Sequence, residues 1–217
     1  MAADNKTHED QHKKVVQIIV ADLFEKINSK PARYILSVAG ESGSGKSETA
    51  NAIAFELGKC GIRSVILGQD EYCNLPPHYN DIKRKEDPDW LGPHAEIKMD
   101  QLQKNITDAV LGTDEIVCPV INPVANTIAD IKTSLSGVKV VIAEGTYVSL
   151  LRNIDSRIFI NRNRLDTLGD RKKRNRRNEV NDPFTEQILV TEHKIIAGHR
   201  FLADYIITND YNVIMPE

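Results

Sequence analysis

The sequence predicts an α/β protein, folded as a three-layer α/β/α sandwich around a mostly parallel sheet. Short apolar runs alternate with amphipathic segments along almost all of the 217 residues, which is the order of elements that βαβ units produce. Most of the apolar runs are continuous, as expected for strands covered on both faces by helices. Polar or glycine-rich turns follow several runs, at the strand ends where such sheets bind ligands.

The expected elements follow one another along the chain. Apolar residues recur at helical spacing over 8–28, which predicts a first helix that ends before Pro31. Strands are expected over 34–39, 64–67, 115–120, 138–143, 156–160 and 203–208, with a short edge strand over 126–133. Further helices are expected over 47–59, 94–111, 163–177 and 183–199. Residues 71–93 are polar and rich in proline, which favours a long loop or an irregular lid.

The length predicts one domain over residues 1–217. Residues 1–30 would form its N-terminal helix, and 71–93 and 163–182 would be additions to the core. The net charge of −3 argues against a basic field that would recruit nucleic acid or an anionic membrane. No apolar run approaches the ~18 residues of a membrane span, and the polar first residues lack a signal-peptide core. We therefore expect a cytoplasmic protein with neither nucleic acid nor membrane as partner. Its oligomeric state stays open, a homo-oligomer included.

The three cysteines, Cys60, Cys73 and Cys118, are far apart and form no CxxC pair. This pattern argues against a disulfide framework or a zinc cluster and fits a reducing compartment.

One segment matches the pattern G-x-x-x-x-G-K-[ST] in full and lies between an expected strand and an expected helix. Its glycines let backbone N–H groups converge on an anion, and the following helix adds its positive N-terminal end. Lys46 would supply charge to the β- and γ-phosphates of a nucleoside triphosphate, and Ser47 would supply a hydroxyl to Mg²⁺. The alternative is a glycine-rich turn with a chance lysine. The assigned nucleotide-binding residues are Gly40, Glu41, Ser42, Gly43, Ser44, Gly45, Lys46, Ser47 and Glu48.

Carboxylates follow two other strands. Glu144 ends the most hydrophobic strand, which is the place of a Walker-B-type acid that holds magnesium; alternatively it caps the next helix. Asp70 ends the second strand, where it could accept a proton from an attacking hydroxyl, or could simply be a turn residue. Tyr72 would contact the acceptor or pack the loop against the core.

Six cations stand in the seven residues from Arg171 to Arg177. Arg171, Arg174 and Arg177 are spaced by three, so they share one face of a helix. Arginines on a lid neutralise charge that develops on a moving phosphoryl group. The alternatives are a solvated basic face and a nucleic-acid patch.

With these motifs the chain, from about Tyr34 to Asp210, resembles the uridine kinase and phosphoribulokinase-like family of P-loop kinases. The phosphate loop and Glu144-Gly145 are similar to that family's, and Gln69-Asp70-Glu71-Tyr72 resembles the segment that carries its catalytic aspartate. Cys118-Pro119-Val120 resembles the strand that leads to its acceptor-binding turn, the Arg174–Arg177 spacing its lid arginines, and Ala203-Asp204-Tyr205-Ile206-Ile207 its closing strand.

The resemblance implies ATP or GTP as donor, Mg²⁺, and a hydroxyl acceptor of low molecular weight. Lys46, Asp70, Arg174 and Arg177 would then be catalytic, and Ser47 and Glu144 would hold the metal. Tyr72, His78 and Asn122 are candidates for acceptor contacts.

The segment Ile121-Asn122, residues 180–183, and the shorter stretch over 187–203 depart from the uridine kinase pattern. All three lie where that family contacts its nucleoside, so the acceptor stays open between a nucleoside and another small molecule such as a sugar phosphate, glycerate or pantothenate. A phosphorylated acceptor would call on Lys83, Arg84 and Lys85. A regulatory nucleotide-binding protein without acceptor, or a nucleic-acid-binding NTPase, would be alternatives of other classes.

Overall fold

The computed structural model describes residues 2–174 and 182–216. Its main sheet has the strand order β2-β5-β1-β6-β7-β8, and every neighbouring pair is parallel except β7 with β8. The strands are β1 (Tyr34–Gly40), β2 (Ser64–Gly68), β5 (Val140–Gly145), β6 (Ser156–Asn161), β7 (Tyr205–Thr208) and β8 (Val213–Ile214). The mostly parallel sheet is confirmed, and the short antiparallel β8 adds an edge strand that the sequence did not predict.

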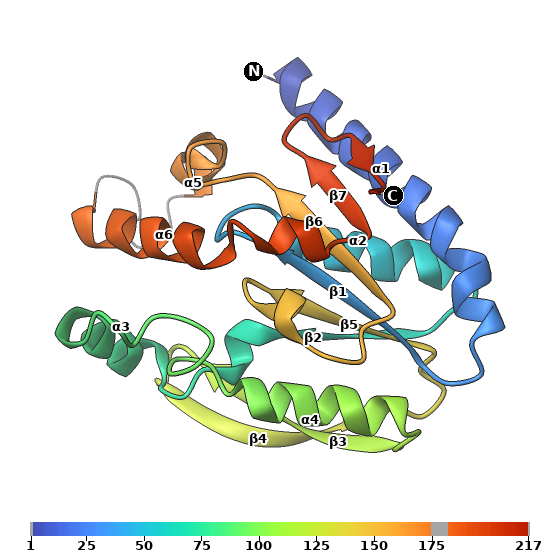
Figure 1. Ribbon diagram of the computed structural model, residues 1–217, viewed down its shortest axis with the longest axis horizontal. Helices are drawn as coiled ribbons and strands as arrows, with labels where there is room; N and C mark the ends of the chain where they lie inside the picture. Colours follow the sequence, from blue (N-terminus) through green and yellow to red (C-terminus); the bar gives the residue numbers. More distant parts are fainter. Residues whose placement is uncertain (1, 175–181, 217) are drawn as a thin grey trace.

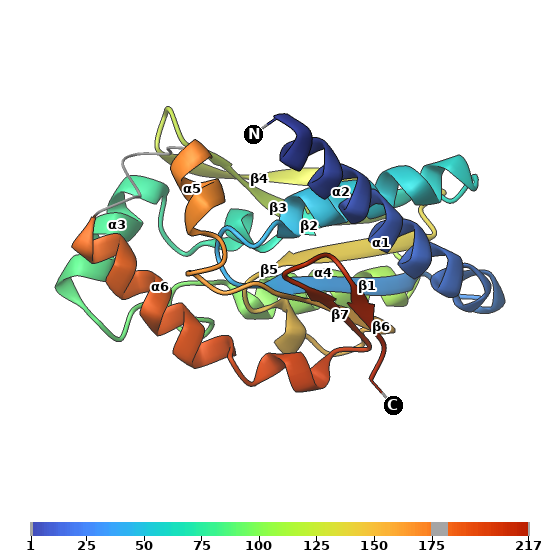
Figure 2. The same ribbon diagram turned by 90° about the horizontal axis from the view of Figure 1, so that it is seen from above.

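Both faces of the main sheet are covered, as the continuous apolar runs predicted. Successive residues of β1 alternate between two apolar clusters, with Leu36 and Val38 in one and Ile35 and Ala39 in the other. The first cluster is completed by α1 (Ala2–Ser29) and α2 (Lys46–Lys59), which cross each other in Figure 2. The first helix therefore packs over the face of the sheet rather than on its edge.

The second face is covered by α4 (Met99–Val110) and by a separate hairpin of β3 (Glu115–Asn122) and β4 (Thr127–Ser134). The sequence placed a strand at each hairpin position, but these strands pair antiparallel with each other and not with the main sheet. The burial pattern gives the reason. Ile116 and Cys118 face the core while Val117 and Val120 are exposed, so β3 is a half-buried strand rather than one covered on both sides.

Residues 71–93 are not a loop throughout, because they contain α3 (Pro77–Glu86) after the short helix η1 (Gln69–Tyr72). Pro77 stands in the first turn of α3, where proline is well tolerated. The helix lacks the apolar stripe that would have predicted it, since Tyr79 and Ile82 are exposed. It is held instead by polar side chains, Asn80 and Arg84, which both contact the buried carboxylate of Glu96.

The helix expected over 94–111 begins only at Met99. The five residues before it run beside the segment that follows η1. The carbonyl of Glu96 accepts a hydrogen bond from the N–H of Asn74, Ile97 forms a bridge with Cys73, and the N–H of Lys98 donates to the carbonyl of Tyr72. These non-local bonds outweigh the helical pattern.

The C-terminal third carries α5 (Leu168–Arg174), α6 (Pro183–Ile196) and the short helices η2 (Val148–Leu150) and η4 (His199–Leu202). α5 starts later than expected because the Asn163 side chain accepts hydrogen bonds from the N–H groups of Leu165 and Asp166, which forms a turn. Asp182 caps α6 by accepting from two N–H groups of its first turn. Among the residues that the structure describes, no helix has the length and hydropathy needed to cross a membrane.

The packing of α1 on the sheet can be tested with two adjacent isoleucines of that helix. Ile19 is fully buried, whereas 49% of Ile18 is exposed. Ile19→Ala should lower the free energy of unfolding by about 2–5 kcal/mol, because it empties a packed site. Ile18→Ala, which removes the same atoms from the same helix, should change it by less than about 1 kcal/mol. Urea unfolding measures both values, and equal losses would contradict this packing.

Candidate active site

The register of the parallel strands brings three strand ends together. Glu144, near the end of β5, pairs with Val38 of β1 on one side and with Gly68 of β2 on the other. The phosphate loop follows β1 directly and η1 follows β2 directly, so both begin at the same edge of the sheet. In Figure 1 the helices α3 and α6 extend beyond this edge on opposite sides.

The loop between β1 and α2 has the backbone that its glycines permit. Gly45 is the N-cap of α2 and has a φ of 99°, a left-handed conformation that glycine adopts without strain. The N–H of Ser44 donates to the carbonyl of Glu41, and Lys46 Nζ donates to the same carbonyl at 3.0 Å. The first turn of α2, with its unpaired N–H groups, therefore opens directly at the loop.

Ser47 and Glu144, predicted to hold the metal, are in contact. Ser47 Oγ donates a hydrogen bond to Glu144 Oε2 at 3.2 Å. Burial raises the pKa of Glu144, as does the nearby charge of Asp70, whereas the charge of Lys46 lowers it. A pair of hard oxygen ligands suits Mg²⁺, which completes its shell with water and phosphate oxygens. No cluster of three or more His, Cys, Asp or Glu side chains suited to a metal occurs within 2–174 and 182–216.

The second residue of the loop is held by two distant segments. Glu41 is buried, its Oε1 lies 2.6 Å from His193 Nδ1 of α6, and its Oε2 accepts from the N–H of Arg164 at 2.8 Å. The carboxylate of Glu41 therefore links the phosphate loop to α6 and to the segment that precedes α5.

The basic helix α5 brings a different arginine to the loop from those that the sequence favoured. Arg171 is 3% exposed, and a Cβ added at Gly43 would lie 3.2 Å from its Cγ. Its Nη2 donates to the carbonyl of Arg164 and to Glu186 Oε1. Its Nε and Nη1 are buried and have no hydrogen-bond partner within the described parts of the chain. Two unpaired guanidinium donors beside a phosphate loop fit an anion.

Arg174 is the last described residue of α5, and Arg177 lies outside the described residues. The spacing by three in the sequence already placed Arg171 on the same helix face as these two. What the sequence did not predict is that Arg171 packs against the loop.

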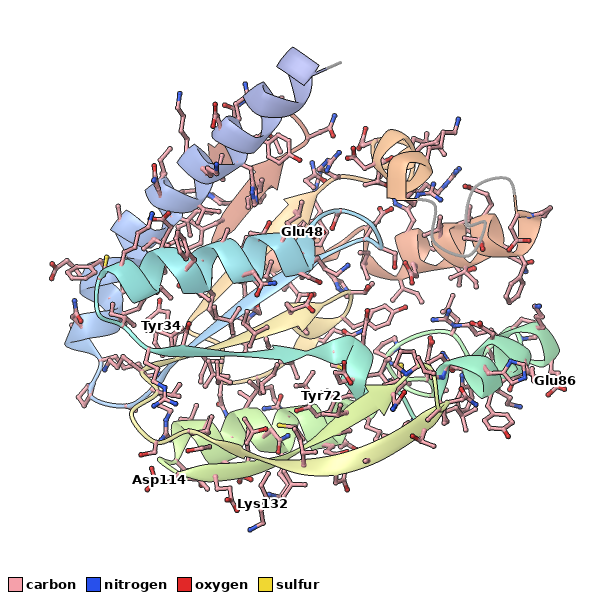
Figure 3. All side chains as sticks on the ribbon, turned by 180° about the vertical axis from the view of Figure 1, so that it is seen from behind. Tyr34, Glu48, Tyr72, Glu86, Asp114 and Lys132 are labelled. Atoms are coloured by element: carbon pink, nitrogen blue, oxygen red, sulfur yellow. The ribbon has the colours of Figure 1, made fainter. Side chains whose placement is uncertain are left out.

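A cavity of about 620 Å³ connects these groups and extends between α3 and α6. The residues of the predicted site that line it are Ser42, Gly43, Gly45, Lys46, Ser47, Glu48, Asp70 and Glu144. Glu48, labelled in Figure 3, lies in the first turn of α2. Asp70 is exposed and lines the cavity, so a molecule bound there can reach its carboxylate. Cys73 also lines the cavity, but burial raises the pKa of its thiol to about 12, which excludes it as a nucleophile near neutral pH.

The three residues proposed for acceptor contacts do not line this cavity. Tyr72 is buried in the core, and its hydroxyl accepts from Asn105 Nδ2 at 2.8 Å; Figure 3 shows it between the end of β2 and the hairpin. The Asn122 side chain accepts from the N–H groups of Val124 and Ala125, which closes the β3–β4 turn. His78 is exposed, and its N–H donates to Asn126. Tyr72 thus serves packing and Asn122 forms a turn, while the His78 side chain is exposed outside this cavity.

The cavity also contains polar residues that the sequence gave no role at this site. Three of them are Glu96, Tyr147 and Glu192 of α6, and they lie beside Arg84 of α3, which the sequence had named only for a phosphorylated acceptor. They come from separate segments, so no spacing along the chain would have grouped them. Only Tyr147 could have been suspected from the sequence, because it follows Glu144, at the end of a predicted strand, by three residues.

Comparison with known proteins agrees with this fold. A family model described as Zeta toxin matches residues 20–113, which is less than half of the chain. Among curated proteins the chain is 26% identical over 207 residues to a bifunctional alpha-galactosidase/sucrose kinase of Mediterraneibacter gnavus. This match covers 88% of the chain but 22% of the relative, so the chain spans about a fifth of that protein's length.

Solved structures show the same architecture. A possible uridine kinase of Bacillus stearothermophilus matches with a TM-score of 0.61 and 15% identity, over 92% of this chain and 98% of that one. The D-glycerate 3-kinase of Cryptococcus neoformans matches with a TM-score of 0.63 and 12% identity, over 93% of this chain and 98% of that one. Phosphoribulokinase of Rhodobacter spheroides matches with a TM-score of 0.63 and 13% identity, over 82% of this chain and 71% of that one. The chain thus has the fold of the P-loop kinases, and its resemblance to uridine kinase and phosphoribulokinase is confirmed at that level.

The close approach of β5 and η1 at the site can be tested at Gly145. A Cβ added there would overlap the side chain of Gln69, whose Oε1 accepts from the N–H of Tyr147. Gly145→Ala should therefore lower the free energy of unfolding by about 1–3 kcal/mol, as overpacking does. Gly58→Ala in α2 meets open space and should raise it by up to about 1 kcal/mol. Thermal unfolding of both variants and the wild type measures these changes. A Gly145→Ala variant as stable as the wild type would contradict the packing of η1.

Proposed function

We infer that this protein, which has the P-loop kinase fold, is a magnesium-dependent phosphotransferase. It moves the γ-phosphoryl group of ATP or GTP to a hydroxyl group of a small molecule. The observation that carries this inference is one continuous cavity, in which the phosphate loop, the Ser47–Glu144 pair and Asp70 meet. Its extension between α3 and α6 leaves room for a second substrate.

The donor would be held by groups that the loop and α5 present. Lys46 and the N–H groups at the start of α2 would bind the β- and γ-phosphates. The unpaired Nε and Nη1 atoms of Arg171 would bind oxygens of the moving phosphoryl group. The site thereby places positive charge where negative charge accumulates during transfer. We also keep Arg174 and Arg177 as candidates for the same task.

Ser47 and Glu144 would hold Mg²⁺, which neutralises phosphate charge when it is bound. Asp70 would accept the proton of the acceptor hydroxyl. The hydroxyl oxygen then forms a bond to the γ-phosphorus, the bond from that phosphorus to the β-phosphate oxygen breaks, and the nucleoside diphosphate leaves.

Names of similar proteins support a small hydroxyl acceptor. The curated relative is named for sucrose, and solved structures of the same fold are named for uridine and D-glycerate. A regulatory protein that binds GTP would normally carry an N-K-x-D segment, which the sequence lacks. A role without an acceptor would leave Asp70 and the extension of the cavity without use.

The test is release of ADP or GDP that depends on an acceptor, measured with Mg-ATP or Mg-GTP and a panel of sugars, nucleosides, sugar phosphates, glycerate and pantothenate. With an active acceptor, Asp70→Asn should lower kcat by about 10²–10⁴-fold because the proton acceptor is lost. Its affinity for the Mg-nucleotide should stay within about twofold, whereas Lys46→Ala should lose that affinity. Normal turnover by Asp70→Asn would refute its role as base, and hydrolysis that no acceptor stimulates would refute the transferase.

Arg171 gives a second test. Arg171→Ala should lower kcat on the order of 10²–10³-fold, with a smaller effect on nucleotide affinity, because its donors act on charge that develops during transfer. Lys172→Ala, which changes an exposed residue of the same helix, should leave both values unchanged. A loss of affinity alone in Arg171→Ala would assign it to ground-state binding.

A further inference from the structure

Four polar residues lie together in the wall of the cavity: Glu96, Tyr147 and Glu192, which are buried, and Arg84, which is partly exposed. We call them the polar cluster. The charges of the other three members all act on the Tyr147 phenol, and so does that of Asp70. Burial raises the pKa of Glu192, and the nearby Ser42 hydroxyl of the phosphate loop lowers it. The polar cluster therefore lies beside both the proposed base and the phosphate loop.

One member of the polar cluster is fully satisfied by its neighbours. Glu96 is 1% exposed, forms an ion pair with Arg84 and accepts from Asn80 Nδ2 at 2.6 Å and from the N–H of Gly92. Asn80 is in turn fixed by Trp90 Nε1, which donates to its Oδ1 at 2.7 Å. The charge of Arg84 is thus neutralised inside the protein, and little of it remains to bind an anionic ligand.

The other members keep unpaired atoms. Tyr147 and Glu192 are 2% and 6% exposed, and the phenol oxygen of the first and Oε2 of the second have no hydrogen-bond partner among the described residues. The same holds for Nε of Arg84. Buried polar groups in proteins are normally paired, so three such atoms in the wall of one cavity point to a ligand that pairs with them. Together they offer a donor, an acceptor and a hydroxyl that can act as either.

The charge of the cavity indicates what kind of ligand fits. Seven acidic and four basic residues line it. Two of the basic ones, Lys46 and Arg171, lie at the phosphate loop, and Arg84 is paired with Glu96. The fourth, Lys85, is exposed and stacks over the Phe184 ring. A second phosphate or a carboxylate on the acceptor would meet more negative than positive charge.

We propose that the polar cluster binds the acceptor, and that the acceptor is an uncharged molecule with several hydroxyl groups, such as a free sugar. Each hydroxyl can donate to Glu192 Oε2, accept from Arg84 Nε, or do either with Tyr147 Oη. This proposal rests on the proposed function, since only a phosphotransferase has an acceptor. It excludes sugar phosphates, glycerate and pantothenate as substrates. A nucleoside shares this chemistry through its ribose.

Binding is measured first, without transfer, by calorimetry on the full chain with a non-hydrolysable Mg-ATP analogue. The probes are glucose, fructose and sucrose, then uridine and cytidine, and then glucose 6-phosphate, D-glycerate and pantothenate. We expect at least one uncharged polyol to bind and none of the anionic probes to bind more tightly. The sugar and nucleoside arms identify which source of hydroxyls is used. Preference for an anionic probe, or no binding of any uncharged one, would overturn the proposal.

Two conservative variants then test the site. Tyr147→Phe should weaken binding of the polyol by about tenfold or more, because it removes a hydroxyl that only the ligand pairs with. Glu192→Gln should weaken it as well, because a neutral amide replaces the carboxylate acceptor. Tyr147→Phe should not lower the melting temperature, since the lost oxygen has no partner in the free protein. Affinity for the nucleotide analogue should stay within about twofold. Tyr79→Phe and Glu86→Gln, on the exposed side and outer end of α3, are the matched controls.

Wild-type polyol affinity in both variants would overturn the assignment of the polar cluster. The outcomes also separate this proposal from the proposed function. Polyol binding that depends on Tyr147, without any nucleoside diphosphate release, would keep the ligand site and refute the transferase. Transfer to a sugar phosphate or to glycerate would keep the transferase and refute the uncharged acceptor.

Discussion

The position of β5 between β1 and β2 determines the geometry of the whole site. Because all three strands are parallel, their carboxyl ends meet at one edge, and Glu144 lies level with Val38 and Gly68. The phosphate loop and η1 must then leave the sheet on either side of Glu144. The contact of Ser47 with Glu144 and the nearness of Asp70 follow from this register, since none of the three residues is close to the others in the sequence.

This dependence explains how much the sequence could predict. The strand–loop–helix unit around Gly45 is local and rests on glycine backbone freedom, so its pattern alone predicts it. The strands of the main sheet were found because both of their faces are apolar. α3 was missed because it is held by Asn80 and Arg84 around Glu96, and polar contacts leave no periodic signal. The partner of β3 was also not predictable, since an alternating strand can pair with a hairpin or with the main sheet.

Residue roles at the acceptor side were hardest to predict for the same reason. Tyr72 belongs to a motif that resembles a catalytic segment, but its hydroxyl is bound by Asn105 in the core. Tyr147 and Glu192, from distant segments, reach the cavity instead. The sequence therefore locates the donor half of the site, which one continuous segment builds. The part of the cavity that we propose for the acceptor is lined from four segments, and only the folded chain shows which of their atoms lack partners among the described residues.

Helix α6 touches both halves. Its His193 contacts Glu41 of the phosphate loop, its Glu186 contacts Arg171, and its Glu192 lies in the polar cluster. One helix thus contacts residues that we propose for each of the two substrates. Thermodynamic linkage then requires reciprocity: whatever factor the nucleotide applies to the affinity for its co-substrate, the co-substrate applies to the nucleotide. A change at α6 would then alter the affinities for both substrates together, even though it touches only one of the two sites.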